Sequence, residues 1–297
     1  QKAWPPPDAL TRAAKQSVRF LGNIVPVTIQ EKMSWVPFQL ELMYEKENLG
    51  IGTAFAYELN GQTYLITNWH NVSGRHPETM KAIHKDLALP NKLLLHYPVD
   101  FNNDKNLPDA ESKVGWSSFE LNLYEDDLPV WYEHPEHGHN VDAIAIPFGI
   151  SASMLKPANA SELDLTKITL RPSLDVFVLG YPRGMTGGAK LPIWKRGSIA
   201  SEPEIDLDKL PKFFIDTATR EGMSGSPVYA QQSGYIVPEG CVGPKDAIFG
   251  EARRFAGIYS GRVGDDNFKA QLGIVWKESA ITEIILGEKK GVSSFEI

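Results

Sequence analysis

The sequence predicts an all-β fold built from antiparallel barrels or sandwiches. Short runs of apolar and β-branched residues alternate with turn-forming residues, and little of the sequence between them has the apolar spacing of a helix. Asn60-Gly61 lies between two of these runs, and this dipeptide is a preferred sequence for a two-residue β-hairpin turn.

The candidate strands cover most of the chain and are followed by one helix. Apolar residues at helical spacing predict that this closing helix spans Glu278–Leu286. The strands that we expect are Phe38–Tyr44, Gly52–Leu59, Thr63–Thr67, Lys92–Tyr97, Ser117–Leu123, Ala143–Pro147, Asp175–Gly180, Ile193–Ile199, Phe213–Thr217, Pro227–Ala230, Phe255–Ser260 and Gln271–Trp276.

The chain divides into an extension and two halves. Residues 1–33 form the predicted N-terminal extension, in which Asp8 can cap a short helix that ends near Phe20. Ser151–Leu170 is rich in polar residues and contains Pro157, as expected of a connection between two domains. We therefore expect a first β-domain over residues 34–155 and a second over residues 156–297.

Composition disfavours several classes of protein. Hydrophobic residues make up 42% of the 297 residues and charged residues 23%, as in a globular protein with a real core. The net charge of −7 disfavours a nucleic-acid partner, and no apolar run is long enough to predict a membrane span. Cys241 is the only cysteine, so no internal disulfide can form. This favours a reducing compartment such as the cytoplasm over a secreted or periplasmic location.

Three short segments carry the residues of a possible catalytic site. His70 follows an apolar strand, Asp142 begins another, and Ser224 lies between glycines just before a third, in residues 221–228 with the sequence Glu-Gly-Met-Ser-Gly-Ser-Pro-Val. A serine hydroxyl becomes a useful nucleophile only when an imidazole takes its proton, and a buried carboxylate orients that imidazole. Glycines let the backbone turn so that two amides, those of Gly222 and Ser224, can bind an oxyanion.

These segments resemble the triad motifs of the chymotrypsin-like (trypsin-like) serine peptidases. The Gly-Met-Ser-Gly-Ser-Pro-Val sequence is most similar to bacterial glutamyl endopeptidases and to related trypsin-like peptidases without disulfides. The order His70, Asp142, Ser224 is that of chymotrypsin, whereas α/β-hydrolases and subtilisins have other orders.

The resemblance implies two antiparallel six-stranded β-barrels, with His70 and Asp142 in the first and Ser224 in the second. It implies a serine endopeptidase of bacterial origin that cleaves polypeptides through an acyl-enzyme and needs no cofactor. An esterase with small acyl substrates is a further alternative, which a comparison of casein with a nitrophenyl ester would distinguish.

The same resemblance implies the residues of a substrate pocket. Ala218 and Thr219 would form its floor, Tyr259 one wall, and Ser260 would help to hold the Asp142 carboxylate. Thr219 matches a threonine that glutamyl endopeptidases use to bind an acidic side chain, but Tyr259 stands where those enzymes have a histidine.

The preferred side chain stays open between two classes. Arg220 or Arg262 could supply positive charge for an acidic side chain. A small or apolar preference is the alternative.

Two departures from the family pattern motivate an alternative function. Trp69 stands where the family has a small alanine, and Met223 replaces the Asp or Asn that precedes the serine. Met223 cannot form the ion pair that activates trypsin-type zymogens, so packing, a partner or substrate must shape the oxyanion loop. The alternative is therefore a latent or inactive protease-fold module that binds or regulates.

The 72 positions from His70 to Asp142 imply an insertion, and residues 73–91 could serve as a lid or bind a regulatory protein.

A histidine-rich segment precedes Asp142. His134, His137 and His139 have spacings that can bind Zn²⁺ or Ni²⁺, but an exposed polar loop is the interpretation that we adopt, so no metal is expected. Asp126 and Asp127 are alternatives for the triad acid, although no comparable apolar strand follows them.

Overall fold

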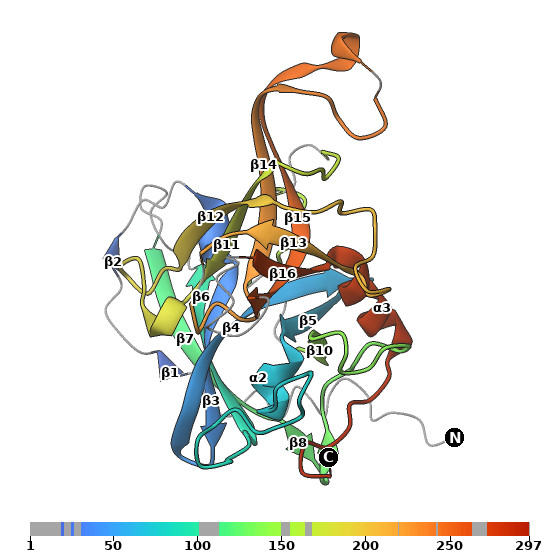
Figure 1. The fold of residues 1–297 in the computed structure, drawn as a ribbon. Coiled ribbons are helices and arrows are strands. Elements are labelled where there is room, and N and C mark those ends of the chain that lie inside the picture. The colour runs from blue at the N-terminus through green and yellow to red at the C-terminus, as the bar shows by residue number, and fades with distance from the viewer. Residues whose placement is uncertain are drawn as a thin grey trace.

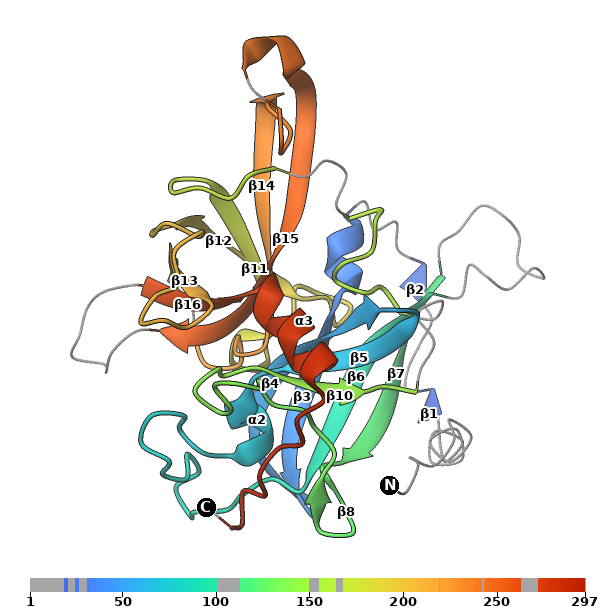
Figure 2. The same ribbon diagram turned by 90° about the vertical axis from the view of Figure 1, so that its right-hand side faces the viewer.

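Two β-sheets follow one another along the chain and lie one above the other (Figures 1 and 2). The computed structural model describes residues 19–20, 25–26, 31–100, 113–149, 155–163, 168–218, 220–241, 243–262 and 272–296. The strands of the first sheet lie within residues 19–147 and those of the second within residues 175–277, in agreement with an all-β fold of two halves.

The first sheet has eight strands, in the order β1-β7-β6-β3-β4-β5-β10, with β2 also paired to β7. The pairs are antiparallel throughout. The strands are β1 (Arg19–Phe20), β2 (Val25–Pro26), β3 (Pro37–Tyr44), β4 (Glu47–Leu59), β5 (Gln62–Thr67), β6 (Lys92–Asp100), β7 (Lys113–Asn122) and β10 (Ile144–Pro147). A separate small hairpin joins β8 (Tyr124–Glu125) and β9 (Leu128–Pro129).

The hairpin between β4 and β5 forms at the predicted turn. Asn60 and Gly61 have φ values of 54° and 76°, and they link the paired residues Leu59 and Gln62. Positive φ at both central residues is typical of a type I′ turn, which is why Asn-Gly is favoured there. This hairpin leads β5 directly to the segment that carries His70.

The second half is the predicted six-stranded barrel. Its strands close in the order β11-β12-β13-β16-β15-β14. They are β11 (Asp175–Gly180), β12 (Ile193–Ile199), β13 (Lys212–Asp216), β14 (Pro227–Ile236), β15 (Ile248–Arg262) and β16 (Leu272–Lys277).

The first half differs in detail from a closed six-stranded barrel. Its six long strands run in the order β7-β6-β3-β4-β5-β10, and among the described strands β7 and β10 are not paired with one another. One edge of β7 binds β6, and the short strands β1 and β2 bind β7 as well. Since a strand has only two edges, the N-terminal strands occupy the one on which β10 would close a barrel.

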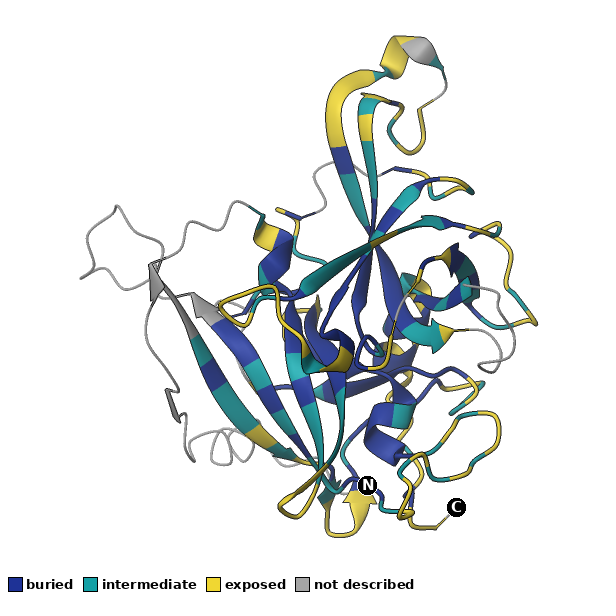
Figure 3. Ribbon diagram, turned by 60° about the vertical axis from the view of Figure 1, so that its left-hand side comes forward, coloured by how far each residue is buried: buried dark blue, intermediate teal, exposed yellow. Residues whose placement is uncertain are grey.

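The hairpin of β14 and β15 is longer than the sequence indicated. It projects from the barrel as a two-stranded arm (Figure 1), and Figure 3 shows that its far end is largely exposed. Apolar and polar residues do not alternate in the arm, whose residues 231–236 read Gln-Gln-Ser-Gly-Tyr-Ile and 248–251 Ile-Phe-Gly-Glu, so the pattern predicted only the parts of these strands that belong to the barrel.

The described residues include four short helical segments besides the strands: η1 (Lys32–Trp35), α2 (Trp69–Ser73), η3 (Pro182–Gly184) and η4 (Pro244–Asp246). The predicted N-terminal helix lies outside the described residues, apart from its expected end, where Phe20 is in β1. None of the helices in the described ranges is long and apolar enough to cross a membrane.

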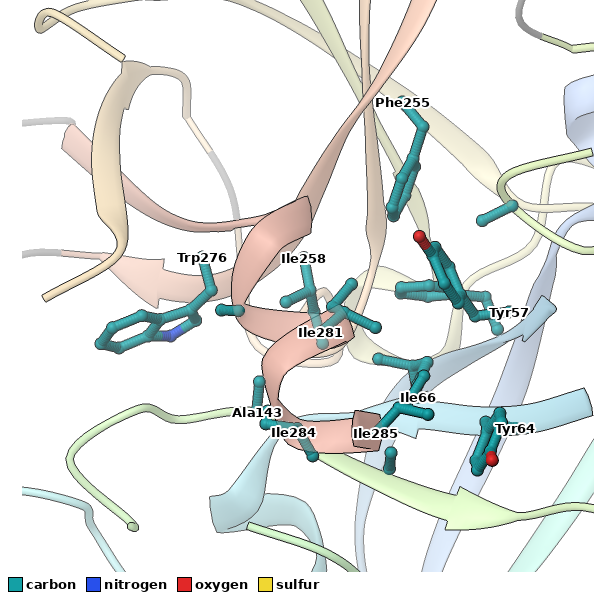
Figure 4. Close-up of a cluster of buried hydrophobic side chains, with 14 of the residues drawn as sticks. Tyr57, Tyr64, Ile66, Ala143, Phe255, Ile258, Trp276, Ile281, Ile284 and Ile285 are labelled. Carbon is teal, nitrogen blue, oxygen red and sulfur yellow. The ribbon is translucent and has the colours of Figure 1, made fainter. Parts of the chain in front are cut away.

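A longer helix, α3 (Glu278–Gly287), confirms the predicted closing helix and packs where the two halves meet. Its buried face carries Ala280, Ile281, Ile284 and Ile285, spaced as one side of a helix requires. These side chains belong to one cluster with residues of both sheets, such as Ile66 on β5 and Ile258 on β15 (Figure 4). The cluster therefore holds the two halves in one arrangement.

The position of Ile281 gives a first prediction. Ile281→Ala should lower the free energy of unfolding by about 3 kcal/mol, because it removes apolar contacts and leaves a cavity between the sheets. Leu286→Ala on the same helix is the control, since Leu286 is 66% exposed, and it should change stability by less than about 0.5 kcal/mol. Urea unfolding measures both; equal losses would show that α3 does not stabilise the junction through its buried face.

Candidate active site

His70 lies in the first turn of α2, directly after β5. The sequence indicated only a strand that ends near this histidine, and the single helical turn was not foreseen. Asn68 precedes the helix and its side-chain Nδ2 donates a hydrogen bond to the backbone oxygen of Asp142 at 2.6 Å. The start of α2 is therefore bound to the segment just before β10.

The carboxylate of Asp142 makes two hydrogen bonds with His70. The backbone N–H of His70 donates to Oδ1 at 2.9 Å, and the imidazole Nδ1 lies 2.7 Å from Oδ2. Because an ionised carboxylate only accepts hydrogen bonds, Nδ1 carries a proton and Nε2 of a neutral imidazole is left as the acceptor. Asp142 is 2% exposed, whereas the His70 side chain remains 16% exposed, so the imidazole reaches solvent.

Ser260 on β15 adds a third hydrogen bond, with its hydroxyl 2.5 Å from Oδ2 of Asp142. Burial is the largest single influence on the pKa of this carboxyl, and it raises the pKa. The charge of His70 and the hydrogen bonds from His70 and Ser260 lower the pKa, and together they outweigh the effect of burial. The pKa of Asp142 is therefore held below its usual value. Ser260, which belongs to the barrel of the second half, thus stabilises the Asp142 anion, which belongs to the first half.

The backbone at Ser224 is bound to the first half of the molecule. Its carbonyl oxygen accepts from the backbone N–H of Thr53 on β4 at 2.8 Å and from Nδ2 of Asn71 at 3.3 Å. Asn71 immediately follows His70 in α2, so Ser224 lies beside the turn that carries the imidazole. Among the described residues, no hydrogen bond joins the Ser224 hydroxyl to His70.

The loop around Ser224 has the conformation that its glycines allow. Gly222 and Gly225 have φ values of 88° and 87°. A Cβ on Gly222 would overlap the carbonyl of Tyr181, and one on Gly225 would overlap the carbonyl of Thr53. Both positions therefore require glycine.

The amides of this loop fall into two groups. Those of Met223, Gly225 and Ser226 donate to backbone carbonyls, whereas within the described ranges those of Gly222 and Ser224 have no backbone acceptor. These are the two amides that the sequence indicated for an oxyanion site.

Packing shapes the loop where an ion pair cannot. The side chain of Met223 is fully buried in the core of the second barrel. The hydroxyl of Thr53 donates to the carbonyl oxygen of Gly222 at 2.8 Å and so fixes the peptide that joins Gly222 to Met223. The loop thus has an apolar anchor on one side and a hydrogen-bonded anchor on the other.

Glu133 is a buried residue near the site that sequence reasoning missed. Its Oε1 accepts from the indole N–H of Trp69 at 3.0 Å, from that of Trp131 at 3.1 Å and from the backbone N–H of Val292 at 3.2 Å. A tryptophan beside the histidine signals that an indole N–H needs an acceptor. Nothing in the sequence identifies which carboxylate, because Glu133 lies 64 positions away.

The pocket residues lie in different environments. Tyr259 is fully buried, and its carbonyl accepts from the amide of Gly225 at 2.9 Å. Ala218 and Arg262 are exposed, and Thr219 lies outside the described residues. A hollow of about 360 Å³ adjoins Gly222 and is lined by residues 48–51 of β4 together with Arg183, Glu221 and Gly222.

The alternative site residues occupy other positions, although the His139 ring packs on that of Trp69, with the centroids 5.4 Å apart. Asp126 and Asp127 occupy the exposed turn between β8 and β9, whereas the carboxylate bonded to His70 is that of Asp142. His134 pairs with Glu283 of α3 at 2.9 Å. Within the part of the chain that the structure describes, no three residues of metal-binding type are grouped so as to hold an ion.

Comparisons with known proteins concern the fold. No protein-family model and no curated protein sequence matches the chain. Similar solved structures include the active form of the Rv3671c protease from M. tuberculosis, which is 15% identical over 88% of this chain and 85% of that one, with a TM-score of 0.42. The serine endoprotease from Yersinia pestis is 11% identical over 96% and 67%, with a TM-score of 0.43. An HtrA-type protease solved with a tripeptide is 13% identical over 85% and 60%, with a TM-score of 0.45. The solved structures similar to this chain are thus HtrA-type and trypsin-like serine proteases, at low identity.

The shared acceptor at Glu133 leads to a prediction about stability. Glu133→Leu should lower the free energy of unfolding by about 3 kcal/mol, because it leaves two buried indole N–H groups and one backbone N–H without an acceptor. Glu133→Gln keeps one oxygen at the same place and should lose less than about half as much. Guanidinium unfolding of both variants distinguishes these outcomes, and similar losses would contradict the role of the shared oxygen.

The lowered pKa of Asp142 leads to a prediction about pH. Because the folded pKa lies below that of an unfolded Asp, about 3.9, the ionised group contributes stability that is present above the unfolded pKa and is lost as pH falls through the folded one. Ser260→Ala removes a hydrogen bond to this anion and should cost about 1–2 kcal/mol at neutral pH. The difference from the wild type should shrink on acidification. Unfolding measured at neutral and at acidic pH tests this, and a pH-independent loss would contradict it.

Proposed function

We propose that the chain is a serine endopeptidase in which Ser224 is the nucleophile, His70 the general base and Asp142 the residue that orients His70. The observation that carries this proposal is the 2.7 Å contact between Nδ1 of His70 and Oδ2 of Asp142. His70 is followed in α2 by Asn71, whose side chain donates to the backbone oxygen of Ser224. Hydrogen bonds between a nucleophile and its base often tighten only when substrate binds. The absence of a direct bond from Ser224 to His70 therefore agrees with the proposal.

The proposed reaction uses the groups in a fixed order. The hydroxyl oxygen of Ser224 attacks the peptide carbonyl while Nε2 of His70 takes its proton, and the amides of Gly222 and Ser224 bind the oxyanion. Collapse of the tetrahedral intermediate breaks the C–N bond, and His70 gives the proton to the leaving amine. Water then attacks the acyl-enzyme by the same route and releases the acid and free Ser224.

The edge of β15 supports an extended polypeptide as the substrate. The pairing of β14 with β15 ends at Pro227 and Ile258, whereas β15 continues to Arg262. Residues 260–262 therefore extend beyond the paired part of β14, and Tyr259, just before them, is bonded to the backbone of Gly225 and Ser226. Strands bind extended peptides by adding them through backbone hydrogen bonds, and we assign the acyl side of the substrate to this part of β15.

A serine-directed fluorophosphonate tests the proposal. The wild type should be labelled, and Ser224→Ala should abolish labelling and lower peptide hydrolysis by about 10³-fold or more, because the nucleophile is lost. Ser226→Ala is the matched control: Ser226 is fully buried and its hydroxyl has no partner in the described structure. This variant should still be labelled.

Mass spectrometry of the labelled peptide locates the modified serine. An unlabelled wild type would overturn the proposal in favour of a latent module with a protease fold. Labelling that survives in Ser224→Ala would show that another serine reacts.

A further inference from the structure

We infer that His134 is a positioning residue for the proposed reaction: its neutral imidazole closes the loop that leads to Asp142, and a proton on this imidazole releases the loop. The effect on catalysis rests on the proposed function, whereas the effect on the loop does not. The sequence predicted an exposed polar loop at this place, but the side chain of His134 is only 2% exposed.

Both ring nitrogens of His134 have partners, and these partners fix its tautomer. The backbone N–H groups of Glu136 and His137 lie 3.3 and 3.2 Å from Nδ1. The carboxylate of Glu283 on α3 lies 2.9 Å from Nε2. Because a backbone N–H can only donate, Nδ1 is an unprotonated acceptor. The proton of the neutral ring is therefore on Nε2, which donates it to Glu283.

A second proton on this ring is incompatible with the turn. It would have to bind Nδ1, which would then face two N–H donors, so both hydrogen bonds to Nδ1 would be lost. Two backbone N–H groups would be left without an acceptor beside a buried cation, and both effects are costly. The protonated form of His134 and the closed turn therefore exclude one another.

The turn at His134 is the first of a series that ends beside Asp142. The amide of Gly138 donates to the carbonyl of His134 at 2.9 Å, and the amide of Val141 donates to the carbonyl of Gly138 at 3.2 Å. Val141 immediately precedes Asp142, whose carboxylate is bonded to His70. The chain thus reaches the proposed triad through turns that build on the one closed by His134.

The loop of residues 133–142 also contacts the start of α2 directly. The carboxylate of Glu133 accepts from the indole N–H of Trp69, and the ring of His139 packs on the same indole with the centroids 5.4 Å apart. Trp69 immediately precedes His70. Loosening of this loop therefore acts on both partners of the contact between His70 and Asp142.

Charged and titratable groups face His134 from its own loop and from the side of α3. Glu136 and His137 belong to the loop, and the centroid of the His137 ring is 4.9 Å from that of His134. Glu283 lies on α3, and the ammonium of Lys289, just after α3, donates to a backbone carbonyl of the loop at 3.2 Å. Carboxylates and cations therefore act on this imidazole in opposite directions.

Burial is the largest influence on the pKa of His134 and lowers it. A charge on His137 lowers the pKa as well, whereas Glu283 and Glu136 raise it, and the net result is a pKa below the usual value. In the open loop the histidine has its ordinary pKa of about 6.5, so protons bind the open loop in preference to the closed one.

The direction of the pH effect follows from this difference. The closed loop has its full stability above the ordinary pKa, and it loses stability as pH falls through that value toward the lowered one. From about pH 7.5 to about pH 5.5 the equilibrium constant for loop opening should rise by up to about 10-fold.

A second histidine of the chain provides a matched control. Residues 76–78 repeat the His-Pro-Glu sequence of residues 134–136. Nδ1 of His76 likewise accepts from two backbone N–H groups, those of Glu78 and Thr79, at 3.3 and 3.4 Å. His76 is exposed, so it forms the same kind of turn without burial.

Hydrogen exchange at the amides of Glu136 and His137 tests the loop in the wild type, His134→Asn and His76→Asn. Asn offers an amide oxygen close to the position of Nδ1 and cannot take up a proton, so it keeps the turn and removes the titration. Protection, corrected for intrinsic exchange, should fall by about 5–10-fold from about pH 7.5 to about pH 5.5 in the wild type and in His76→Asn. In His134→Asn it should change by less than about 2-fold.

Two results would overturn the inference. One is a wild type whose protection at these amides does not fall, and the other is an equal fall in His134→Asn. If His134→Asn does not fold, exchange in the wild type and in His134→Gln, whose amide can donate to Glu283, decides the question.

The rate of fluorophosphonate labelling from about pH 7.5 to about pH 4.5 tests the effect on the proposed site. His70 titrates in every variant, but in the wild type His134 must be neutral as well. The logarithm of the rate should therefore fall with a slope approaching two in the wild type and His76→Asn, and approaching one in His134→Asn. At the lowest pH, His134→Asn should keep at least about 3-fold more of its own neutral-pH rate than the wild type.

The outcomes separate this inference from the proposed function. A labelled wild type with the same pH profile as His134→Asn overturns the positioning role and leaves the proposed function standing. A wild type that is labelled at no pH overturns the proposed function, and with it the role of His134 in catalysis.

Discussion

The buried carboxylate of Asp142 is the interaction on which the rest of the site depends. A charge in a protein interior is tolerated only when donors surround it, and this one receives a backbone N–H, an imidazole N–H and a hydroxyl. Two donors come from His70 in the first half and one from Ser260 in the second. Satisfying one anion thus brings α2 and β15 together and orients the imidazole.

Thr53 makes the corresponding connection on the other side of the site. Its amide binds the carbonyl of Ser224, and its hydroxyl binds that of Gly222. Gly225 can approach Thr53 only because it has no side chain. The serine loop is therefore held by backbone hydrogen bonds across the junction as well as by Met223 in the core, and needs no ion pair to keep its conformation.

Some features were predictable because they depend on neighbours in the sequence. The alternation of apolar residues indicated the strands of both halves, the Asn60-Gly61 turn fixed one hairpin, and helical spacing indicated α3. Other features depend on partners that are distant in the chain. The arm of β14 and β15 lacks an apolar alternation because its far end is largely exposed and has no buried face, although the rings of Tyr235 and Phe249 pack on one another there. The first sheet is open at β7 because the short strands β1 and β2 bind there.

By itself the sequence determined the all-β class, most of the long strands and the chain order of His70, Asp142 and Ser224. Local periodicity and turn chemistry are encoded by adjacent residues, so they can be read without coordinates. The sequence already favoured Asp142 over Asp126 and Asp127 as the partner of His70, but only the tertiary structure decided which acceptor satisfies Trp69 and where the ring of Tyr259 lies. These contacts join residues far apart in the chain, and packing across the two halves selects them from many partners of the same chemistry.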